Sequence, residues 1–271
     1  MKKIIFTLLM STVAMGSFAQ LSTELGYNLG FSSYLGDLQP KAFTYDQPGF
    51  STGFHIRHNI TSQLAVRGMV NYGRLNASDA KSLDQGHIQR NLSFRTYIME
   101  FGGVMEVNVL PFDKFNTKNK KYRRYFNFTP FFFGGVNVFH FNPKTLYKNE
   151  WVALQPLQTE GQTYNLTQIA IPFGFGFKHQ VSKHIGFQIE FGFRKTFTDY
   201  IDDVSTNYPD LNKLALNNPT AADLSFRGDE LPENPQTTPT PGTQRGLSSN
   251  MDWYLINNVS FTYKIFQNKK Y

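Results

Sequence analysis

Three neighbouring aspartates are the first residues of this chain whose type and spacing could do chemistry. Asp199, Asp202 and Asp203 lie within the segment Thr198–Val204. Gathered carboxylates suit Ca²⁺, but a calcium loop usually has a glycine at its turn and alternates its ligands, and this segment has neither feature. We expect the aspartates to accept hydrogen bonds at the end of a loop. The sequence predicts no metal site and no bound cofactor.

Acid–base or nucleophilic catalysis is the other chemistry that these residue types support. His140 could pair with Asp202, because both are expected near the same end of the fold. The chain has six scattered histidines and lacks the patterns G-x-S-x-G, H-E-x-x-H and the phosphate-binding loop. We therefore predict that the protein is not an enzyme, and a hydrolase built on this fold remains an alternative.

A short basic run stands out in a chain whose 27 Lys and Arg exceed its 20 Asp and Glu. Such a run can bind nucleic acid, lie beside anionic lipid head groups or contact a partner protein. We expect no nucleic acid, because the leader described below exports the chain, and the other two interpretations stay open. The run consists of Lys118, Lys120, Lys121, Arg123 and Arg124.

The leader and the composition indicate the compartment. Residues 1–19 have the features of a secretory signal peptide, with Lys2 and Lys3, a short apolar stretch, and small residues at Ser17 and Ala19. No cysteine is present, which excludes a disulfide framework, a thiolate metal site and an acylated lipoprotein cysteine. We expect export by the Sec route and a folded part that spans residues 20–271.

The elements that would position these residues are strands with a period of two. In residues 185–193, apolar side chains alternate with glycine, glutamine and glutamate, and residues 169–177 alternate in the same way. Successive side chains of a strand point to opposite faces, so one face is bulky and apolar. Because the other face is rich in glycine and isolated charges, it suits the narrow lumen of a membrane barrel better than the wet face of a soluble sandwich.

Eight such segments predict an all-β fold, an eight-stranded antiparallel transmembrane barrel. Short turns, about two and three residues long, alternate with loops of roughly 14 to 52 residues, which is the pattern of short periplasmic turns and long extracellular loops. The connection 110–124 is the exception, since it should be a short turn. The segments are residues 22–34, 49–60, 63–75, 93–109, 125–141, 164–180, 184–198 and 251–266.

The last connection, residues 200–250, is expected to be one long mobile extracellular loop. Its segment Pro232–Pro241 is rich in proline and threonine, a composition typical of extended chain. We interpret these residues as a loop of the barrel and not as a second domain.

The alternation also points a set of charged side chains into the lumen. They could line a path for ions, or they could pair with one another and plug the barrel. Both signs occur in similar number, and the lumen of eight strands is just wide enough for side chains, so we predict a salt-bridge plug. The set is Glu24, Arg57, Arg67, Glu100, Glu106, Lys178, Glu190, Arg194 and Lys264.

Two segments carry a family resemblance. Tyr34-Leu-Gly-Asp-Leu38 follows the first strand, and Phe193–Tyr208 closes the seventh. Together they resemble a family of small outer-membrane barrels of Bacteroidota that includes PorG, the outer-membrane component associated with the periplasmic ring of the type IX protein secretion system. The motif positions are Gly36, Asp37, Asp199, Tyr200, Asp202, Asp203 and Tyr208.

The resemblance implies an integral outer-membrane protein with a structural or docking role in that secretion machinery. Its partners would be outer-membrane lipid, the ring lipoprotein and the partner protein of that lipoprotein, with the basic run 118–124 as the periplasmic contact. The family supplies no catalytic or ligand residues to carry over. A general surface or porin-like barrel is the alternative.

Overall fold

The computed structural model describes residues 22–39, 47–112, 126–232 and 235–267. The expected signal peptide, residues 1–19, and the basic run, residues 118–124, lie outside the described residues. Within the described ranges, no helix has the length and apolar character needed to cross a membrane.

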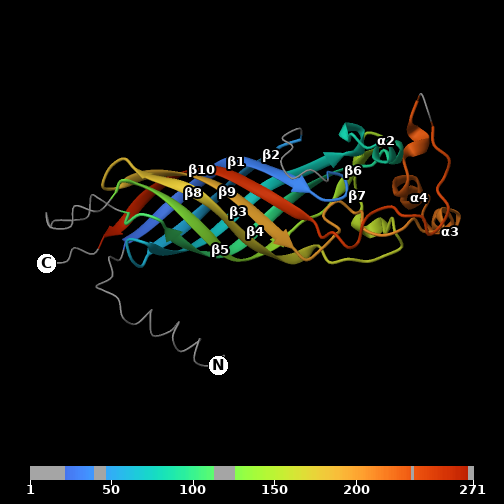
Figure 1. The fold of residues 1–271 in the computed structure, drawn as a ribbon. Coiled ribbons are helices and arrows are strands. Elements are labelled where there is room, and N and C mark those ends of the chain that lie inside the picture. Colours follow the sequence, from blue (N-terminus) through green and yellow to red (C-terminus); the bar gives the residue numbers. More distant parts are fainter. Residues whose placement is uncertain (1–21, 40–46, 113–125, 233–234, 268–271) are drawn as a thin grey trace, which may run out of the picture.

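Eight long antiparallel strands form a closed barrel (Figure 1). Each strand pairs with its neighbours along the chain, and the first pairs with the last, which closes the ring. The predicted fold class is therefore confirmed. The strands are β1 (Ser22–Leu35), β2 (Gly49–Asn59), β3 (Leu64–Ser78), β4 (Ser93–Asn108), β5 (Phe128–His140), β8 (Thr167–Gln180), β9 (Ile185–Thr196) and β10 (Trp253–Gln267).

The connections divide between the two ends of the barrel. The short turns between β2 and β3 and between β8 and β9 lie at the end where β1 begins and β10 ends, which is also the end where β4 ends and β5 begins. The long connections that follow β1, β3, β5 and β9 lie at the other end (Figure 1). Long loops mark the extracellular end of such barrels. These loops contain a hairpin and short helices: β6 (Lys144–Tyr147), β7 (Glu150–Ala153), α2 (Gln85–Arg90), α3 (Leu211–Asn217), α4 (Pro219–Ser225), η1 (Asp79–Lys81), η4 (Gln155–Leu157) and η5 (Gly228–Glu230).

Residues 200–250 are more structured than one long loop. The side chain of Asp210 caps α3, the side chain of Asn218 caps α4, and Pro219 occupies the first turn of α4. Leu224 of α4 and Ile201 are buried in the apolar core. No helix was predicted in this connection, because a period of two identifies strands and not helices of seven residues.

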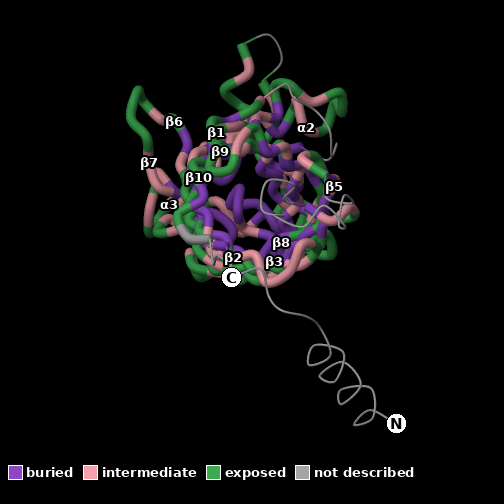
Figure 2. The backbone as a smooth tube through the Cα atoms, turned by 90° about the vertical axis from the view of Figure 1, so that its left-hand side faces the viewer, coloured by how far each residue is buried: buried purple, intermediate pink, exposed green. Residues whose placement is uncertain are grey.

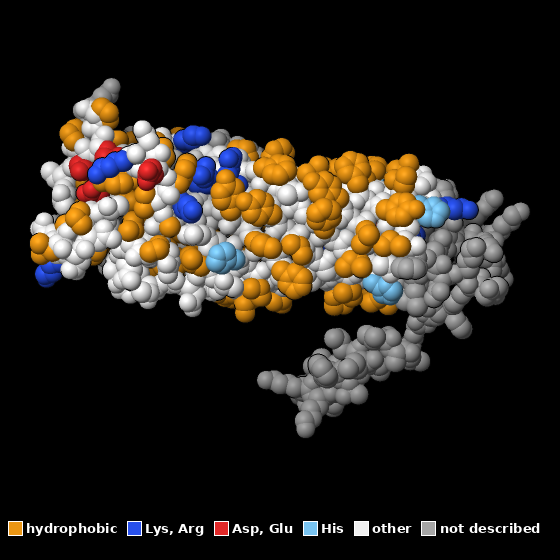
Figure 3. All heavy atoms as spheres, turned by 180° about the vertical axis from the view of Figure 1, so that it is seen from behind, with side chains coloured by type: hydrophobic (Ala, Val, Ile, Leu, Met, Phe, Trp, Pro, Cys, Tyr) orange, Lys and Arg blue, Asp and Glu red, His pale blue; other side chains and the backbone are white. Residues whose placement is uncertain are grey.

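The outer wall of the barrel is apolar and the inner wall is polar. Buried residues lie on the inside of the ring in Figure 2, and Figure 3 shows a band of apolar side chains on the face of the barrel that it presents. Phe54, Phe101 and Phe132 are at least 60% exposed on this band, whereas Glu100 and Glu106 are fully buried. This reverses the pattern of a water-soluble protein, so lipid is the solvent that the outer wall fits.

The apolar core fills the extracellular half of the lumen. Tyr34 of β1, Phe94 of β4, Phe139 of β5 and Tyr254 of β10 pack there against loop residues such as Ile201. The rings of Phe139 and Tyr254 lie 5.3 Å apart. The long extracellular connections are therefore anchored to the barrel by side chains that point into it.

Each of β4 and β5 contains two consecutive glycines, Gly102-Gly103 and Gly134-Gly135, and these let the two strands approach closely. Val104 faces Gly135 in the register of these strands, and Gly103 faces Val136. A Cβ atom on Gly135 would lie 2.0 Å from the backbone oxygen of Gly103, whereas a Cβ atom on Gly134 would meet nothing closer than 3.9 Å. Glycine is thus required at Gly135, whereas a side chain at Gly134 would have room.

Replacing Gly135 with alanine should lower the free energy of unfolding by roughly 1–3 kcal/mol, because the added methyl group forces the strands apart. Gly134→Ala is the matched control and should change it by less than about 0.5 kcal/mol. Urea titration in detergent micelles, followed by the fluorescence of Trp151 and Trp253, measures both. Equal losses for the two variants would contradict the close contact at Gly135.

Candidate functional site

Glu106 on β4 lies at the centre of the buried charges in the periplasmic half of the barrel. Nε of Arg57 donates to its carboxylate at 2.7 Å, Nζ of Lys178 donates at 2.6 Å, and Nε of Arg67 lies 2.8 Å away. These cations come from β2, β8 and β3, and all four side chains are at most 3% exposed. One carboxylate therefore compensates cations from three other strands.

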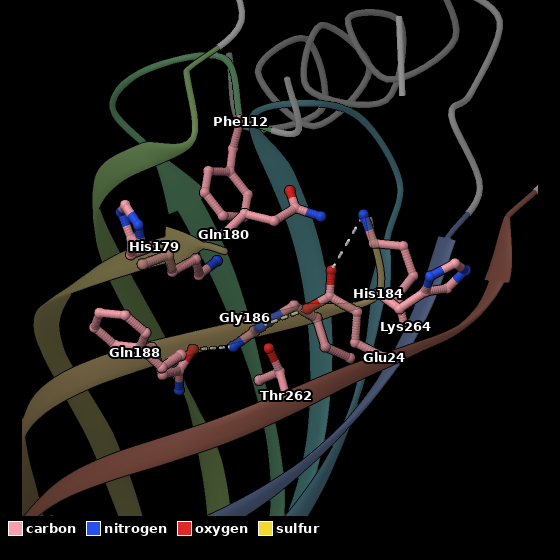
Figure 4. Close-up of a pocket in the computed structure, with 12 residues that line it drawn as sticks. Glu24, Phe112, His179, Gln180, His184, Gly186, Gln188, Thr262 and Lys264 are labelled. Atoms are coloured by element: carbon pink, nitrogen blue, oxygen red, sulfur yellow. Dashed lines mark hydrogen bonds and ion pairs between the residues drawn. The ribbon is translucent and has the colours of Figure 1, made fainter. Parts of the chain in front are cut away.

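The same two arginines form further ion pairs inside the lumen. Nη1 of Arg57 donates to Glu24 at 2.9 Å, and Nη1 of Arg67 lies 2.6 Å from Glu190. Glu24 in turn faces Lys264, with 4.0 Å between the charged atoms (Figure 4). The hollow that Glu24 and Arg57 line at this end has a volume of about 10 Å³, which is room for about one water molecule.

A second layer of paired charge lies further toward the extracellular end. Arg194 of β9 contacts Glu100 of β4 at 3.1 Å. Tyr254 and Asn71 donate to the same carboxylate, each at 2.7 Å. All oxygens of this buried carboxylate thus have partners, as a buried charge requires.

The structure places all nine predicted lumen charges inside the barrel and in ion pairs with one another. The alternation of the strands was enough to locate them, because side-chain direction in a strand depends only on position. The packed ion pairs occupy the lumen that an ion path would need. This arrangement can hold strands together, and it offers no exposed catalytic group.

Changing Glu106 to glutamine should lower the free energy of unfolding by about 3–5 kcal/mol, because three buried cations lose the charge that they share. Glu150→Gln makes the same change on exposed β7 and should stay within about 0.5 kcal/mol of wild type. The double variant Glu106→Gln/Lys178→Met should recover part of the loss, since it removes one uncompensated cation. Urea unfolding measures all three, and equal stability of the two single variants would refute the central role of Glu106.

A buried tyrosine and two aspartates join the extracellular loops to the barrel. The hydroxyl of Tyr34 lies 2.7 Å from a carboxyl oxygen of Asp202 and 2.7 Å from one of Asp252. A hydroxyl has one proton and can donate to only one of them, so the second contact is a hydrogen bond only if that carboxyl is protonated. Burial raises the pKa of both Asp202 and Asp252 well above the usual value, which favours that proton.

A second buried cluster surrounds Asp203. Its carboxylate accepts hydrogen bonds from Thr159 and Tyr164, and Arg245 lies 3.9 Å away. Arg245 also pairs with Glu160 at 2.8 Å. Burial raises the pKa of Asp203 to about 6, although Arg245 acts in the opposite direction. These contacts join the connection between β7 and β8 to the connection between β9 and β10.

The seven family-motif residues all lie at this extracellular end. Gly36 packs against Tyr34 and Asp252 so closely that a Cβ atom would clash with both side chains. The carboxylate of Asp37 accepts from the backbone N–H of Leu247. Tyr200 stacks on Tyr164 with the ring centres 4.5 Å apart. Asp199, Asp202 and Asp203 are at most 4% exposed, and Tyr208 is 7% exposed.

The catalytic pair considered in the sequence does not form. His140 lies on the outer wall, where its Nδ1 is 3.0 Å from the hydroxyl of Thr167. Asp202 is buried inside with Tyr34. Among the described residues, no group of three or more His, Cys, Asp or Glu is placed to hold a metal ion.

Several residues of the extracellular clusters were not predicted from the sequence. Asp252, Glu160 and Arg245 were not singled out, and neither was the buried pair of Asp79 and Arg90, which forms two hydrogen bonds of 2.8 Å. These residues lie in or beside loops, where no periodicity predicts which way a side chain points. Tyr34 was named only as the first residue of a motif.

An open hollow of about 660 Å³ lies among the extracellular loops. The rings of Tyr208 and Phe226 meet edge to face in its wall, with centres 6.0 Å apart. Rings, amides and charged groups in one hollow suit a polar ligand. Other side chains that line it are Asp37, His87, Arg90 and Gln244.

The extracellular end should lose stability as the pH rises. Burial raises the pKa of Asp199 from 3.8 to about 8. A carboxyl whose pKa is higher in the folded than in the unfolded chain contributes stability at low pH and loses it as the pH rises through the folded value. For Asp199 this window runs from about pH 4 to about pH 8.

Limited proteolysis of residues 200–250 should therefore be slower at pH 5 than at pH 8.5. Asp199→Asn should reduce this difference and slow cleavage of the loop at pH 8.5, although the raised pKa values of Asp202, Asp203 and Asp252 leave part of it. Asp229→Asn, at an exposed position, should behave as wild type. The cleavage rate at each pH is the measurement. An unchanged pH dependence in Asp199→Asn would show that another group controls the loop.

A closed barrel with an apolar outer wall, a polar inner wall and long loops at one end defines an integral outer-membrane β-barrel protein. Within this class the chain belongs to the family described as "Domain of unknown function (DUF6089)", which matches residues 2–231. No curated protein matches the sequence.

Solved barrels of several bacteria show a distant likeness. Neisserial surface protein A (NspA) has 8% identity, with 90% of this chain and 97% of that chain covered and a TM-score of 0.43. Ail of Yersinia pestis has 7% identity, with coverages of 92% and 100% and a TM-score of 0.39. OprG of Pseudomonas aeruginosa has 10% identity, with coverages of 92% and 98% and a TM-score of 0.39. Because these TM-scores lie below 0.5, the conclusions about this chain rest on its own geometry.

Proposed function

We propose that this chain is a non-enzymatic outer-membrane barrel with a structural or docking role in the type IX protein secretion machinery, like PorG. The filled lumen is the observation that carries this proposal. Nine charged side chains are buried and paired inside the barrel, so transport through it is disfavoured. The surfaces at its two ends are then the parts that can act on other molecules.

The contact between the two resembling segments supports the same role. Tyr34 comes from the first segment and Asp202 from the second, 168 residues apart in the chain, and their side chains meet at 2.7 Å. Asp37 of the first segment holds the backbone at Leu247, at the far end of the long connection. The motif residues thus stabilise the extracellular end by joining its loops, which suits a scaffold protein better than a catalyst.

The periplasmic contact is proposed from the sequence alone. The basic run 118–124 belongs to the connection between β4 and β5. That connection leaves the end of the barrel that carries the short turns, which faces the periplasm. A positive segment there would steer an acidic surface of the ring lipoprotein or its partner toward the barrel.

The quadruple reversal of Lys120, Lys121, Arg123 and Arg124 to glutamate should reduce recovery of the periplasmic ring proteins at least tenfold. The tagged barrel is extracted from native outer membranes in mild detergent, and the co-eluting proteins are quantified by mass spectrometry. Lys183→Glu, in the short periplasmic turn between β8 and β9, controls for a general change of charge.

Heat-modifiable migration on a gel checks that each variant still folds into a barrel. Full recovery of the ring proteins by the folded quadruple variant would remove the basic run from the proposal. A wild-type barrel that elutes alone, also after crosslinking, would sink the secretion role and leave the fold untouched.

A general surface barrel is the second candidate, and the extracellular hollow beside Tyr208 and Phe226 is the observation that favours it. Such a protein would bind a polar ligand from the medium and would need no periplasmic partner. A porin-like barrel would give channel steps when its conductance is measured in planar bilayers. We expect no such steps, because paired charges fill the lumen.

A further inference from the structure

Three cations gather on the outer wall of the barrel at its extracellular end. They are Arg74 of β3, Arg95 of β4 and Lys144 of β6, named here the outer basic patch. The register places Arg95 directly opposite Lys144. Arg74 lies opposite Tyr97, which puts it diagonally across from Arg95. The three side chains thus come from neighbouring positions on three paired strands, within reach of a single ligand.

Aromatic rings lie on both sides of the outer basic patch. Tyr72 and Tyr97 lie toward the apolar band, and Trp151, opposite Leu146 in the hairpin, lies toward the loops. Tyr72 and Tyr97 stack with their ring centres 5.6 Å apart, and both are more than 40% exposed. The guanidinium of Arg95 lies 3.5 Å from the ring centre of Trp151 and 5.5 Å from that of Tyr97. Exposed tyrosine and tryptophan rings mark the level where lipid chains give way to head groups.

The patch also lies at the edge of the apolar band. In β4 the outward positions run from Arg95 through Tyr97 to Met99 and Phe101, which are 59% and 68% exposed. Arg95 therefore sits two outward positions beyond the apolar part of the strand, on the side of the long loops. Figure 3 shows Lys and Arg side chains gathered between the apolar band and the loop end of the barrel.

The patch has no compensating acid in the described part of the chain. Arg74, Arg95 and Lys144 take part in none of the ion pairs seen there, in contrast to the nine charges of the lumen. Nε of Arg74 is buried and has no hydrogen-bond partner among the described residues. Like charges that face each other across two strands repel, so an anion between Arg95 and Lys144 would relieve the repulsion.

We propose that the outer basic patch binds a phosphate group of lipopolysaccharide in the outer leaflet. The extracellular end of the barrel faces this phosphorylated glycolipid, which replaces phospholipid on that side of a bacterial outer membrane. Two guanidinium groups present planar forks of donors that match phosphate oxygens. Lys144 adds a third cation from the hairpin, the rings of Tyr72 and Tyr97 contact the boundary between the sugar and the acyl chains, and Trp151 holds the guanidinium of Arg95 on the loop side.

Native mass spectrometry of the refolded full chain with purified lipopolysaccharide tests this proposal. The wild-type barrel should retain one lipopolysaccharide molecule with at least tenfold higher apparent affinity than the triple variant Arg74→Gln/Arg95→Gln/Lys144→Gln. Chemically dephosphorylated lipopolysaccharide should bind the wild type as weakly as the intact lipid binds the triple variant.

Lys195→Gln provides the matched control. Lys195 is also exposed near an aromatic ring, with its Nζ 6.0 Å from the ring centre of Trp253, but no second cation lies opposite it in the register. This variant should bind as wild type. If the triple variant does not fold, Lys144→Gln alone tests the site, because Lys144 lies on a hairpin outside the barrel.

Three outcomes would overturn the proposal. A folded triple variant could bind as tightly as wild type, or dephosphorylated lipid could bind as tightly as intact lipid. Vesicles of phosphatidylglycerol could also compete as well as lipopolysaccharide at equal charge, which would make the patch a general anionic-lipid surface. None of these outcomes depends on the secretion role, since the assay contains only the barrel and lipid.

Discussion

The pairing of Glu106 with three cations is the interaction on which the rest of the barrel depends. Eight strands enclose a lumen that side chains fill, so every inward charge leaves water and needs a partner. Glu106 meets Arg57, Arg67 and Lys178 from three other strands, and it thereby links strands that are not neighbours. The same pairing fills the lumen, so the outer wall and the loops are the surfaces that can contact other molecules.

The extracellular end follows a different physical solution. Its lumen is apolar, with Phe139 and Tyr254 at the centre, and the acids above this core have few cations. Asp202 and Asp252 share the hydroxyl of Tyr34, and burial, which raises the pKa of both, favours a proton on one of them. A loop cluster of this kind is most stable at low pH, and it loses stability as its carboxyls ionise with rising pH.

The sequence predicted the inner and outer faces well and the loops poorly. Arg194 was placed in the lumen from its position in an alternating strand, yet its partner Glu100 lies 94 residues away, and nothing local links the two. The helices α3 and α4 were missed although Asp210 and Asn218 are typical N-cap residues, because a period of two identifies strands only. Arg245 was not noticed, although it holds Glu160 and lies beside Asp203 in one cluster.

The sequence by itself determined the eight strands, the side on which each residue points and the content of charge in the lumen. Side-chain direction in a strand is local, so alternation along the chain is enough to specify it. Only the tertiary structure decided which charges pair and which loop carboxyls contact the hydroxyl of Tyr34. It also decided that Arg74, Arg95 and Lys144 share one patch. Those contacts depend on the register in which the barrel closes, which brings together residues that are distant in the chain.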